Sequence, residues 1–398
     1  MKKLVIAALA IFTMVNTGNS QFESYKFGDG IKVTSKDSSF YMRFGFRFQN
    51  LAISSWRLAD EGTEYSANML VRRSRLKFDG YAFTPKLNYK LELGLTNRDV
   101  GGGTGPEFNR GSNIVLDAFA SYSFHKNWSI WFGQTKLPGN RERVVSSANL
   151  QLVDRSRLNS RYNIDRDVGL QLRHTFKVGS DFIFREAFAF SQGEGRDVTA
   201  GHFGGYEYTF RVEMLPFGSF ASKGDYIGSA IKRESTPKLS IGATYDINKN
   251  AVRERGNLGS FIKDDNGNYY GKDLKTFFAD LMFKYQGLSI ASEYADKETE
   301  DGVPTVLDSE NNVVGTFYTG RAFTIQMGYM FENNIEMVLR FTDNNPDDLV
   351  ANDEVRWTFG LNKFFVGHKL KIQTDFQSIR PDGGTNSFVW RTQMDVHF

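Results

Sequence analysis

Residues 40–51 read FYMRFGFRFQNL, and this stretch decides the fold. Successive side chains of a β-strand point to opposite faces, so Phe44, Phe46 and Phe48 share one face. Arg43 and Arg47 then share the other face, whereas a helix would scatter all five residues around its axis. The stretch therefore predicts a strand with one very apolar face and one basic face.

The same alternation recurs along the chain. In YEYTFRVEM at 206–214, aromatic and aliphatic residues take the even positions and polar residues take the odd ones. An even number of such strands is typical of bacterial outer-membrane barrels. The sequence contains sixteen candidate strands, near 39–52, 68–82, 86–97, 113–124, 127–135, 166–177, 182–191, 206–215, 238–247, 275–285, 287–296, 320–331, 334–343, 353–365, 368–379 and 387–398.

The connections between these segments alternate in length. Tight turns, such as HKN at 125–127, alternate with long polar stretches; the long segment 216–237 breaks this rhythm because it stands where a turn is expected. Outer-membrane barrels have short periplasmic turns and long extracellular loops. We therefore predict an all-β fold, a sixteen-stranded antiparallel transmembrane β-barrel over residues 39–398. The long connections are 53–67, 98–112, 136–165, 192–205, 248–274, 297–319, 344–352 and 380–386.

Composition supports a wall between lipid and water. Aromatic residues make up 15% of the chain, with 36 phenylalanines, yet the mean hydropathy is −0.41 because polar residues separate them. After Gln21 no apolar run is long enough for a transmembrane helix. The absence of cysteine excludes disulfides and a lipoprotein anchor. The formal net charge is only +3, so overall charge predicts no partner.

The first twenty residues, MKKLVIAALAIFTMVNTGNS, have a basic start, a short apolar run and small residues near the end. This pattern predicts a secretory signal peptide over residues 1–20. We expect residues 21–38 to form a short periplasmic segment before the barrel, and the mature protein to reside in the bacterial outer membrane.

Aromatic residues beside the tight turns predict an interfacial girdle. Two charged residues, Arg72 and Glu186, fall on the apolar face by simple parity. An arginine facing lipid at mid-membrane costs about 2–4 kcal/mol of stability. Either these residues lie near an interface, where they can reach water, or a bulge shifts the register. The predicted girdle residues are Phe83, Phe124, Trp128, Phe331, Phe364 and Phe365.

The same cost requires Arg43 and Arg47 to face an aqueous lumen. Inward basic residues gather first in the two N-terminal strands, at Arg43, Arg47, Arg73, Arg75 and Lys77. A second group lies in the long third outer connection and the strand after it, at Lys136, Arg141, Arg143, Arg155, Arg157, Arg161, Arg166 and Arg173. We expect this connection, about 136–165, to fold inward as a constriction loop that attracts anions. The alternative is that these arginines pair structurally with lumen acids such as Glu92, Asp117, Asp167 and Glu213.

Two blocks resemble a known family, the phosphate-selective porins O and P of Gram-negative outer membranes. They are VRRSRLKFDGYAF at 71–83 and FGQTKLPGNRERVVSSANLQLVDRSRLNSRYNIDRDVGLQL at 132–172. The resemblance implies a trimeric sixteen-stranded barrel with an arginine ladder leading to a lysine-containing constriction. In this chain the resemblance assigns these features to Arg72, Arg73 and Lys136. The chain departs from the family pattern at LPGNRERV and in the extra charged pair Lys77 and Asp79.

We therefore predict a porin that passes small solutes by diffusion, with a bias toward anions such as phosphate. The open alternatives are a non-selective general porin and a non-conducting scaffold or adhesion barrel. The residues predicted to line the pore or bind anions are Arg43, Arg47, Arg72, Arg73, Arg75, Lys77, Lys136, Arg141, Arg143 and Arg173.

The expected partners are small anionic solutes, outer-membrane lipid and lipopolysaccharide, and two further copies of the chain. The acidic stretch NNPDD at 344–348 could meet calcium in lipopolysaccharide. The five histidines form no catalytic motif, and DDNGN at 264–268 lacks the later glutamate of a calcium loop. We expect no enzymatic activity, no metal site, no cofactor and no nucleic-acid partner.

Overall fold

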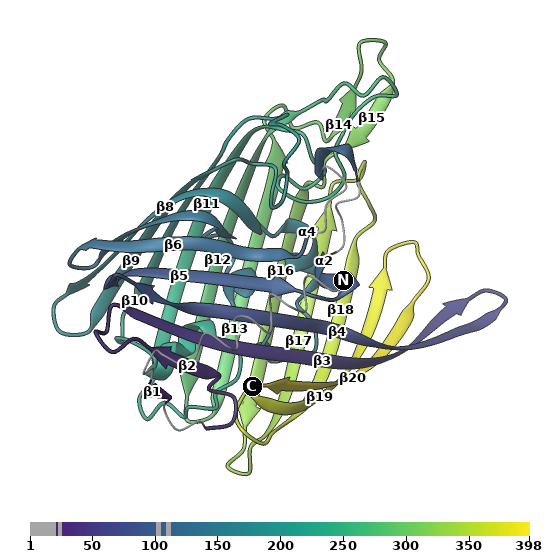
Figure 1. Cartoon of the computed structure of the whole chain (residues 1–398). Coiled ribbons are helices and arrows are strands. Elements are labelled where there is room, and N and C mark those ends of the chain that lie inside the picture. Colours follow the sequence, from purple (N-terminus) through teal and green to yellow (C-terminus); the bar gives the residue numbers. More distant parts are fainter. Residues whose placement is uncertain (1–20, 23–25, 101–104, 109–112) are drawn as a thin grey trace, which may run out of the picture.

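The computed structural model is a closed antiparallel barrel (Figure 1). It describes residues 21–22, 26–100, 105–108 and 113–398. The predicted signal peptide lies outside the described residues. The barrel closes because the last strand pairs with β3, from Ser387↔Arg57 to His397↔Arg47. Its sixteen strands are β3 (Phe40–Ala59), β4 (Gly62–Ala82), β5 (Thr84–Gly94), β6 (Val115–His125), β7 (Trp128–Lys136), β8 (Arg166–Val178), β9 (Phe182–Ser191), β10 (Glu207–Leu215), β11 (Lys238–Ala251), β12 (Lys272–Tyr285), β13 (Leu288–Thr299), β16 (Gly320–Met330), β17 (Ile335–Pro346), β18 (Glu354–Phe364), β19 (Leu370–Pro381) and β20 (Ser387–His397).

Burial in the wall is inverted relative to a water-soluble protein. Along β10 the polar residues are buried and the apolar ones exposed: Arg211 is 4% exposed and its neighbour Phe210 is 47% exposed. In β3, Arg47 and Gln49 are buried, whereas Phe46 and Phe48 on the other face are partly exposed. The predicted alternation is confirmed, with apolar side chains directed outward and polar ones into the lumen. Among the described residues, no helix has the length and apolar character needed to cross a membrane.

The N-terminal segment extends the sheet beside β3. Strand β2 (Ile31–Thr34) pairs with β3 at Ile31↔Phe44, and the short β1 (Gln21–Phe22) pairs with β2. The chain end lies at the same place, because the Phe46 N–H and the Phe398 carbonyl are 3.3 Å apart in a hydrogen bond. The segment therefore sits at the rim that carries the tight turns.

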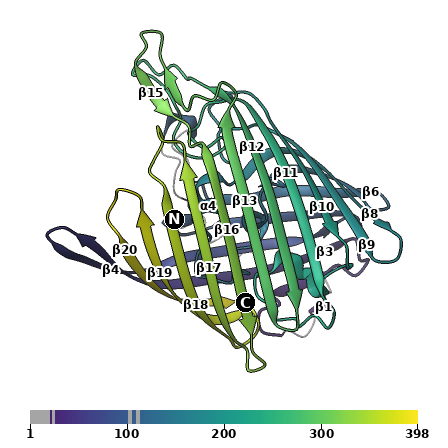
Figure 2. The same ribbon diagram turned by 180° about the vertical axis from the view of Figure 1, so that it is seen from behind.

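The alternation of short and long connections is confirmed, except for the first outer one. The sequence suggested a loop at 53–67, but β3 continues to Ala59 and β4 begins at Gly62, so a narrow two-stranded ribbon projects beyond the wall (Figures 1 and 2). Cross-strand pairs hold it: the Ser55 and Ser66 hydroxyls are 2.7 Å apart, and the Trp56 and Tyr65 rings are 5.5 Å apart. Periodicity missed the ribbon because both of its faces carry polar residues.

Arg72 and Glu186 are explained by different mechanisms. The β3–β4 pairing passes from Gln49↔Arg73 to Asn50↔Val71, so Arg72 is the extra residue of a β-bulge. The bulge turns its side chain into the lumen, where Nη2 lies 3.1 Å from Asp154 Oδ1. The pairing around Glu186 is continuous. Glu186 therefore stays on the outer face, near the β8–β9 turn, and bonds to His174 at 3.1 Å.

The aromatic girdle is largely confirmed. Phe83, Phe124, Phe331 and Phe365 are all exposed on the outer surface beside the tight turns. Phe364 was predicted wrongly, because it is only 2% exposed and packs in the lumen. Its neighbours there are Ala230, Ile231 and Met330.

The long connection 137–165 folds into the lumen, where Figure 1 shows its helix α4 inside the barrel. It contains α3 (Arg141–Val144) and α4 (Arg157–Tyr162), whose N-cap Ser156 accepts a hydrogen bond from the Asn159 N–H. An apolar patch draws it inward, since side chains of the connection pack against small and aromatic residues of the wall. The cluster comprises Leu137, Leu158, Tyr162, Ile164, Ala189, Phe278, Ala295 and Ala322.

The segment 216–237 also enters the lumen, from the side of the tight turns. Lys284 Nζ donates to the carbonyl oxygens of Ile227 and Ser229 at 2.7 and 2.8 Å, and the Ser229 hydroxyl donates to Glu336 at 2.7 Å. The segment includes the 3₁₀ helix η3 (Ala221–Tyr226). It fills space beneath the connection 137–165, so its length reflects packing rather than a surface turn.

The remaining short elements lie in the outer connections. They are α2 (Asn97–Val100), η2 (Pro106–Phe108) and the hairpin of β14 (Thr305–Leu307) and β15 (Val313–Thr316), which rises above the barrel (Figure 1). The stretch 264–268 is a tight turn, in which Asp264 accepts hydrogen bonds from the Asn268 N–H and side chain. Among the described residues, no cluster of three metal-ligating side chains is present.

Candidate functional site

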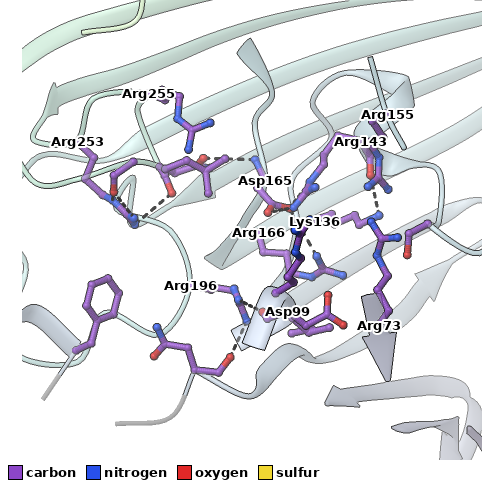
Figure 3. A pocket seen from close by; sticks show the side chains of 18 of the residues that line it. Arg73, Asp99, Lys136, Arg143, Arg155, Asp165, Arg166, Arg196, Arg253 and Arg255 are labelled. Carbon is purple, nitrogen blue, oxygen red and sulfur yellow. Dashed lines mark hydrogen bonds and ion pairs between the residues drawn. The ribbon is translucent and has the colours of Figure 1, made fainter. Parts of the chain in front are cut away.

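One cavity in the lumen is bounded by basic side chains. It has a volume of about 550 Å³ and lies between strand β4, the connection 137–165 and the outer connections (Figure 3). Eleven basic and three acidic residues line it. The basic residues are Arg72, Arg73, Arg75, Arg98, Lys136, Arg143, Arg155, Arg166, Arg196, Arg253 and Arg255, and the acidic ones are Asp99, Asp165 and Glu254.

Some of these cations are neutralised by carboxylates. Arg75 binds Asp99 through two hydrogen bonds, at 2.8 and 2.7 Å, and Glu92 through a third at 2.9 Å. Arg143 forms a bidentate pair with Asp165. Bidentate pairing fixes the guanidinium plane and cancels most of the charge that it presents to the lumen.

A second group is held by main-chain carbonyls. Arg155 donates to the carbonyl oxygens of Glu142 and Val145 at 2.8 and 2.7 Å. Arg253 donates to those of Gly259 and Glu194, and Arg255 to that of Ser160. Lys136 belongs to the same group, with three carbonyl acceptors. Because a carbonyl carries only a partial negative charge, these contacts position each cation without neutralising it.

Burial and crowding act on the cations of the inward connection. Burial lowers the pKa of Arg143, and the neighbouring Arg155 and Arg166 lower it further. Burial lowers the pKa of Arg155 to about 10; Glu142 opposes this shift, and Arg75 and Arg166 add to it. Arginine side chains keep their proton in proteins, so both residues carry a positive charge. The protonated form of each is destabilised by its neighbours, so an anion in the cavity would relieve the repulsion.

The cavity continues on both sides. A chamber of about 400 Å³ shares Arg72, Arg73, Arg143, Arg155 and Arg255 with it. Another chamber of about 290 Å³ lies toward the tight turns and shares Arg75. The basic residues of that chamber are Arg43, Arg47, Arg75, Lys77 and Lys90. Basic side chains thus line three adjoining chambers along one side of the lumen.

Two of the predicted residues lie elsewhere. Arg141 is buried in a compact ion-pair network, with Nε 2.6 Å from Asp280 and Nη2 3.4 Å from Glu213. Arg173 stacks over the Trp131 ring, with Cζ 4.2 Å from the ring centroid. It lines a separate cavity of about 390 Å³. Arg141 therefore pairs with lumen acids, which is the alternative that the sequence left open.

The other eight predicted residues line the adjoining chambers, in two sets. The first set lines the chamber of about 290 Å³ and comprises Arg43, Arg47 and Lys77. Asp79 pairs there with Arg43 and Lys77, at 2.7 and 3.1 Å. The five that line the cavity of about 550 Å³ are Arg72, Arg73, Arg75, Lys136 and Arg143, which come from β4, β7 and the inward connection.

Sequence reasoning did not assign Arg98, Arg196, Arg253 or Arg255 to the site. All four belong to outer connections, where basic residues are ordinarily solvated. Arg253 is brought in by aromatic rings, since its Cζ lies 5.0 Å from the Phe261 centroid and 5.8 Å from that of Phe108. The run VRER at 252–255 offers no periodic signal that separates it from a solvated loop.

Comparison of the chain with known proteins agrees with this architecture. The solved structures that resemble it include the outer-membrane channel DcaP of Acinetobacter baumannii, at 12% identity and a TM-score of 0.52, covering 91% of this chain and 99% of that one. OmpF of Salmonella typhi, in complex with daunomycin, is 11% identical with a TM-score of 0.54, and the match covers 90% of this chain and 98% of that one. An anion-selective porin from Comamonas acidovorans is 9% identical with a TM-score of 0.51, and the match covers 90% of this chain and 100% of that one. At these identities the likeness concerns the fold.

Sequence comparison gives the family. A curated relative from Aquifex aeolicus (strain VF5), described as an uncharacterized protein, is 23% identical over 305 residues, which are 72% of this chain and 68% of the relative. The family model described as phosphate-selective porin O and P matches residues 43–337. Family and fold together indicate a channel of the bacterial outer membrane rather than an enzyme. The chain belongs to the phosphate-selective porin O and P family.

Proposed function

We propose that this porin is a diffusion channel biased toward small anions, with phosphate among its solutes. The observation that carries the proposal is the excess of basic over acidic side chains around the cavity of about 550 Å³. A ring of arginine and lysine side chains selects anions through its field, and the fork of guanidinium donors suits phosphate and carboxylate oxygens.

The mechanism is attraction followed by short-lived exchange. The field of the basic chambers raises the local concentration of anions. An entering anion exchanges part of its hydration shell for contacts with guanidinium groups and then moves to the next chamber. Cations held by carbonyls suit this role, because they are fixed in place and keep their charge. The ten residues predicted from sequence contribute unequally: eight line the chambers, and Arg141 and Arg173 do not.

Planar-bilayer recordings of a double variant test the proposal. Arg98 and Arg255 line the cavity and pair with no carboxylate among the described residues. In Arg98→Gln/Arg255→Gln, we expect the anion-to-cation permeability ratio from the reversal potential to fall by roughly twofold or more. Arg255→Gln also removes the hydrogen bond to the Ser160 carbonyl, whereas the other loop contacts that shape the cavity should persist.

Arg380→Gln/Lys363→Gln is the matched control. It also removes two positive charges, but both lie on the outer surface, away from the cavity. We expect this control to keep the wild-type reversal potential. A double variant of Arg98 and Arg255 that behaves like this control would contradict the proposed role of the basic cavity.

We further propose that three copies assemble, as the family resemblance implies, and that the rim contacts lipopolysaccharide. The acidic stretch at 344–348 ends β17 and begins the connection to β18 at the outer rim. Calcium could bridge its carboxylates to lipopolysaccharide phosphates. Crosslinking of the protein in native outer membranes would show the subunit number. Removal of divalent cations should weaken the association with lipopolysaccharide.

A further inference from the structure

One carboxylate of the inward connection faces a group of three arginines. Asp154 Oδ1 lies 3.1 Å from Arg72 Nη2 and 3.5 Å from Arg73 Nη2, and Oδ2 lies 3.7 Å from Arg391 Nη1. The arginine side chains are 17%, 5% and 10% exposed, whereas that of Asp154 is 25% exposed. The carboxylate thus sits on the open side of the arginines, in the chamber of about 400 Å³.

Asp154 is held more loosely than other acids of the lumen. Asp375 binds Arg391 through two hydrogen bonds at 2.7 and 3.0 Å, and its side chain is fully buried. Asp79 is as exposed as Asp154, but it pairs with two cations at 2.7 and 3.1 Å. Asp154 makes a single hydrogen bond of ordinary length, to Arg72, and its other two contacts are long.

The backbone around Asp154 is fixed, so only its side chain can move. The Val153 N–H donates to Asp375 Oδ2 at 3.1 Å, and Arg340 Nη1 donates to the Asp154 carbonyl at 3.0 Å. The arginines also keep unused capacity, since Arg72 Nε is buried without a hydrogen-bond partner. The Asp154 carboxylate therefore does not use the full hydrogen-bonding capacity of the arginines around it.

We propose that the Asp154 carboxylate occupies a solute-anion position on Arg72, Arg73 and Arg391, and that passing anions compete with it. This inference rests on the proposed anion channel and deepens it. A tethered carboxylate carries one charge. A singly charged solute gains little by displacing it, whereas a doubly charged one interacts more strongly with three guanidinium groups. Asp154 therefore selects for doubly charged oxyanions and keeps binding weak enough for release.

Conductance measured over a range of acetate and sulfate concentrations tests the inference, with purified protein in planar bilayers. We expect Asp154→Asn to lower the half-saturating acetate concentration by roughly three- to tenfold. The change for sulfate should be smaller, so the preference for sulfate over acetate shrinks. Asp165→Asn is the matched control, because it removes the same charge from the same chamber but from a tight pair with Arg143.

Asp154→Glu separates competition from a simple field effect. It keeps the net charge, so a field effect predicts wild-type behaviour. Competition predicts an intermediate shift for acetate, because the longer side chain loses more rotamer freedom when it binds. Equal shifts in Asp154→Asn and Asp165→Asn for both anions, or unchanged behaviour of Asp154→Glu, would overturn the inference. A wild-type channel that prefers cations would instead overturn the proposed function.

Discussion

At the residue scale, Lys136 both lines the basic cavity and holds the inward connection. Its Nζ donates to the carbonyl oxygens of Arg143, Val144 and Val145 at 2.7, 3.1 and 3.3 Å. These carbonyls lie at the C-terminal end of α3, where the helix dipole favours a cation. All three ammonium donors are therefore used by the connection itself. Lys136 lines the cavity, while its hydrogen bonds hold the connection 137–165.

Lys136→Met should therefore loosen the connection 137–165 and also remove one positive charge from the cavity. We expect a loss of about 1–3 kcal/mol in the free energy of unfolding, because buried carbonyls lose charged donors. We also expect larger fluctuations of the single-channel current. Lys136→Arg, which restores charge and donors, should recover steady currents. Unchanged stability and steady current in Lys136→Met would show that these hydrogen bonds do not hold the connection.

At the scale of single elements, each strand separates two solvents. In β10 the outward Phe210 alternates with the inward Thr209 and Arg211. An arginine on the outer face near mid-membrane costs about 2–4 kcal/mol, a large part of a typical folding free energy of about 5–15 kcal/mol. The sign of a substitution's effect should therefore depend on the face that it occupies rather than on its chemistry alone.

Phe210→Arg and Ser121→Arg test this dependence. Ser121 faces the lumen, since it pairs with Asn88 on the face of Lys90 and Asp117. We expect Phe210→Arg to lower the free energy of unfolding by about 2–4 kcal/mol. Ser121→Arg should assemble like the wild type. Denaturant titration in lipid vesicles measures both. Equal losses in the two variants would mean that the faces are assigned wrongly.

Sequence alone predicted the elements whose two faces meet different solvents. Strand β9 at 182–191 has the predicted bounds, because its alternation is uninterrupted. The ribbon of β3 and β4 was missed because both faces meet water. Phe364 was assigned to the girdle, although segment 216–237 brings an apolar surface into the lumen at that point. Parity cannot detect a lumen that is partly filled by protein.

The site was predictable where it lies on strands and not where loops assemble it. Arg43, Arg47 and Arg73 follow from alternation and the cost of facing lipid. Arg141 was expected among the anion-binding residues, but its acids come from β10 and β12, distant in sequence. Those long-range pairings depend on how the connection docks, which no local pattern encodes.

At the scale of the whole molecule, the lumen is divided into two halves with different electrostatics. Beside β10–β13, Arg141, Arg211 and Arg185 balance Asp280, Glu213 and Asp225 in a closed network. Beside β3–β8 lie the basic chambers. The connection 137–165 and the segment 216–237 both pack against the wall in the first half, so protein occupies part of the barrel interior there.

Replacing residues 217–236 by a short turn should open the filled half. We expect a larger single-channel conductance, because the segment occupies space in the lumen beside the ion-pair network. Correct assembly is checked by migration on gels before and after heating. A shortened, assembled channel with wild-type conductance would show that the segment does not restrict the pore.

The reversal potential of the unmodified channel in a salt gradient tests the central claim most directly. With potassium chloride concentrated on one side of a planar bilayer, the basic chambers predict a reversal potential of the sign set by chloride, with chloride more permeant than potassium. Repeating the measurement with potassium phosphate should keep that sign. A reversal potential near zero, or one set by potassium, would contradict a lumen whose arginines and lysines select anions.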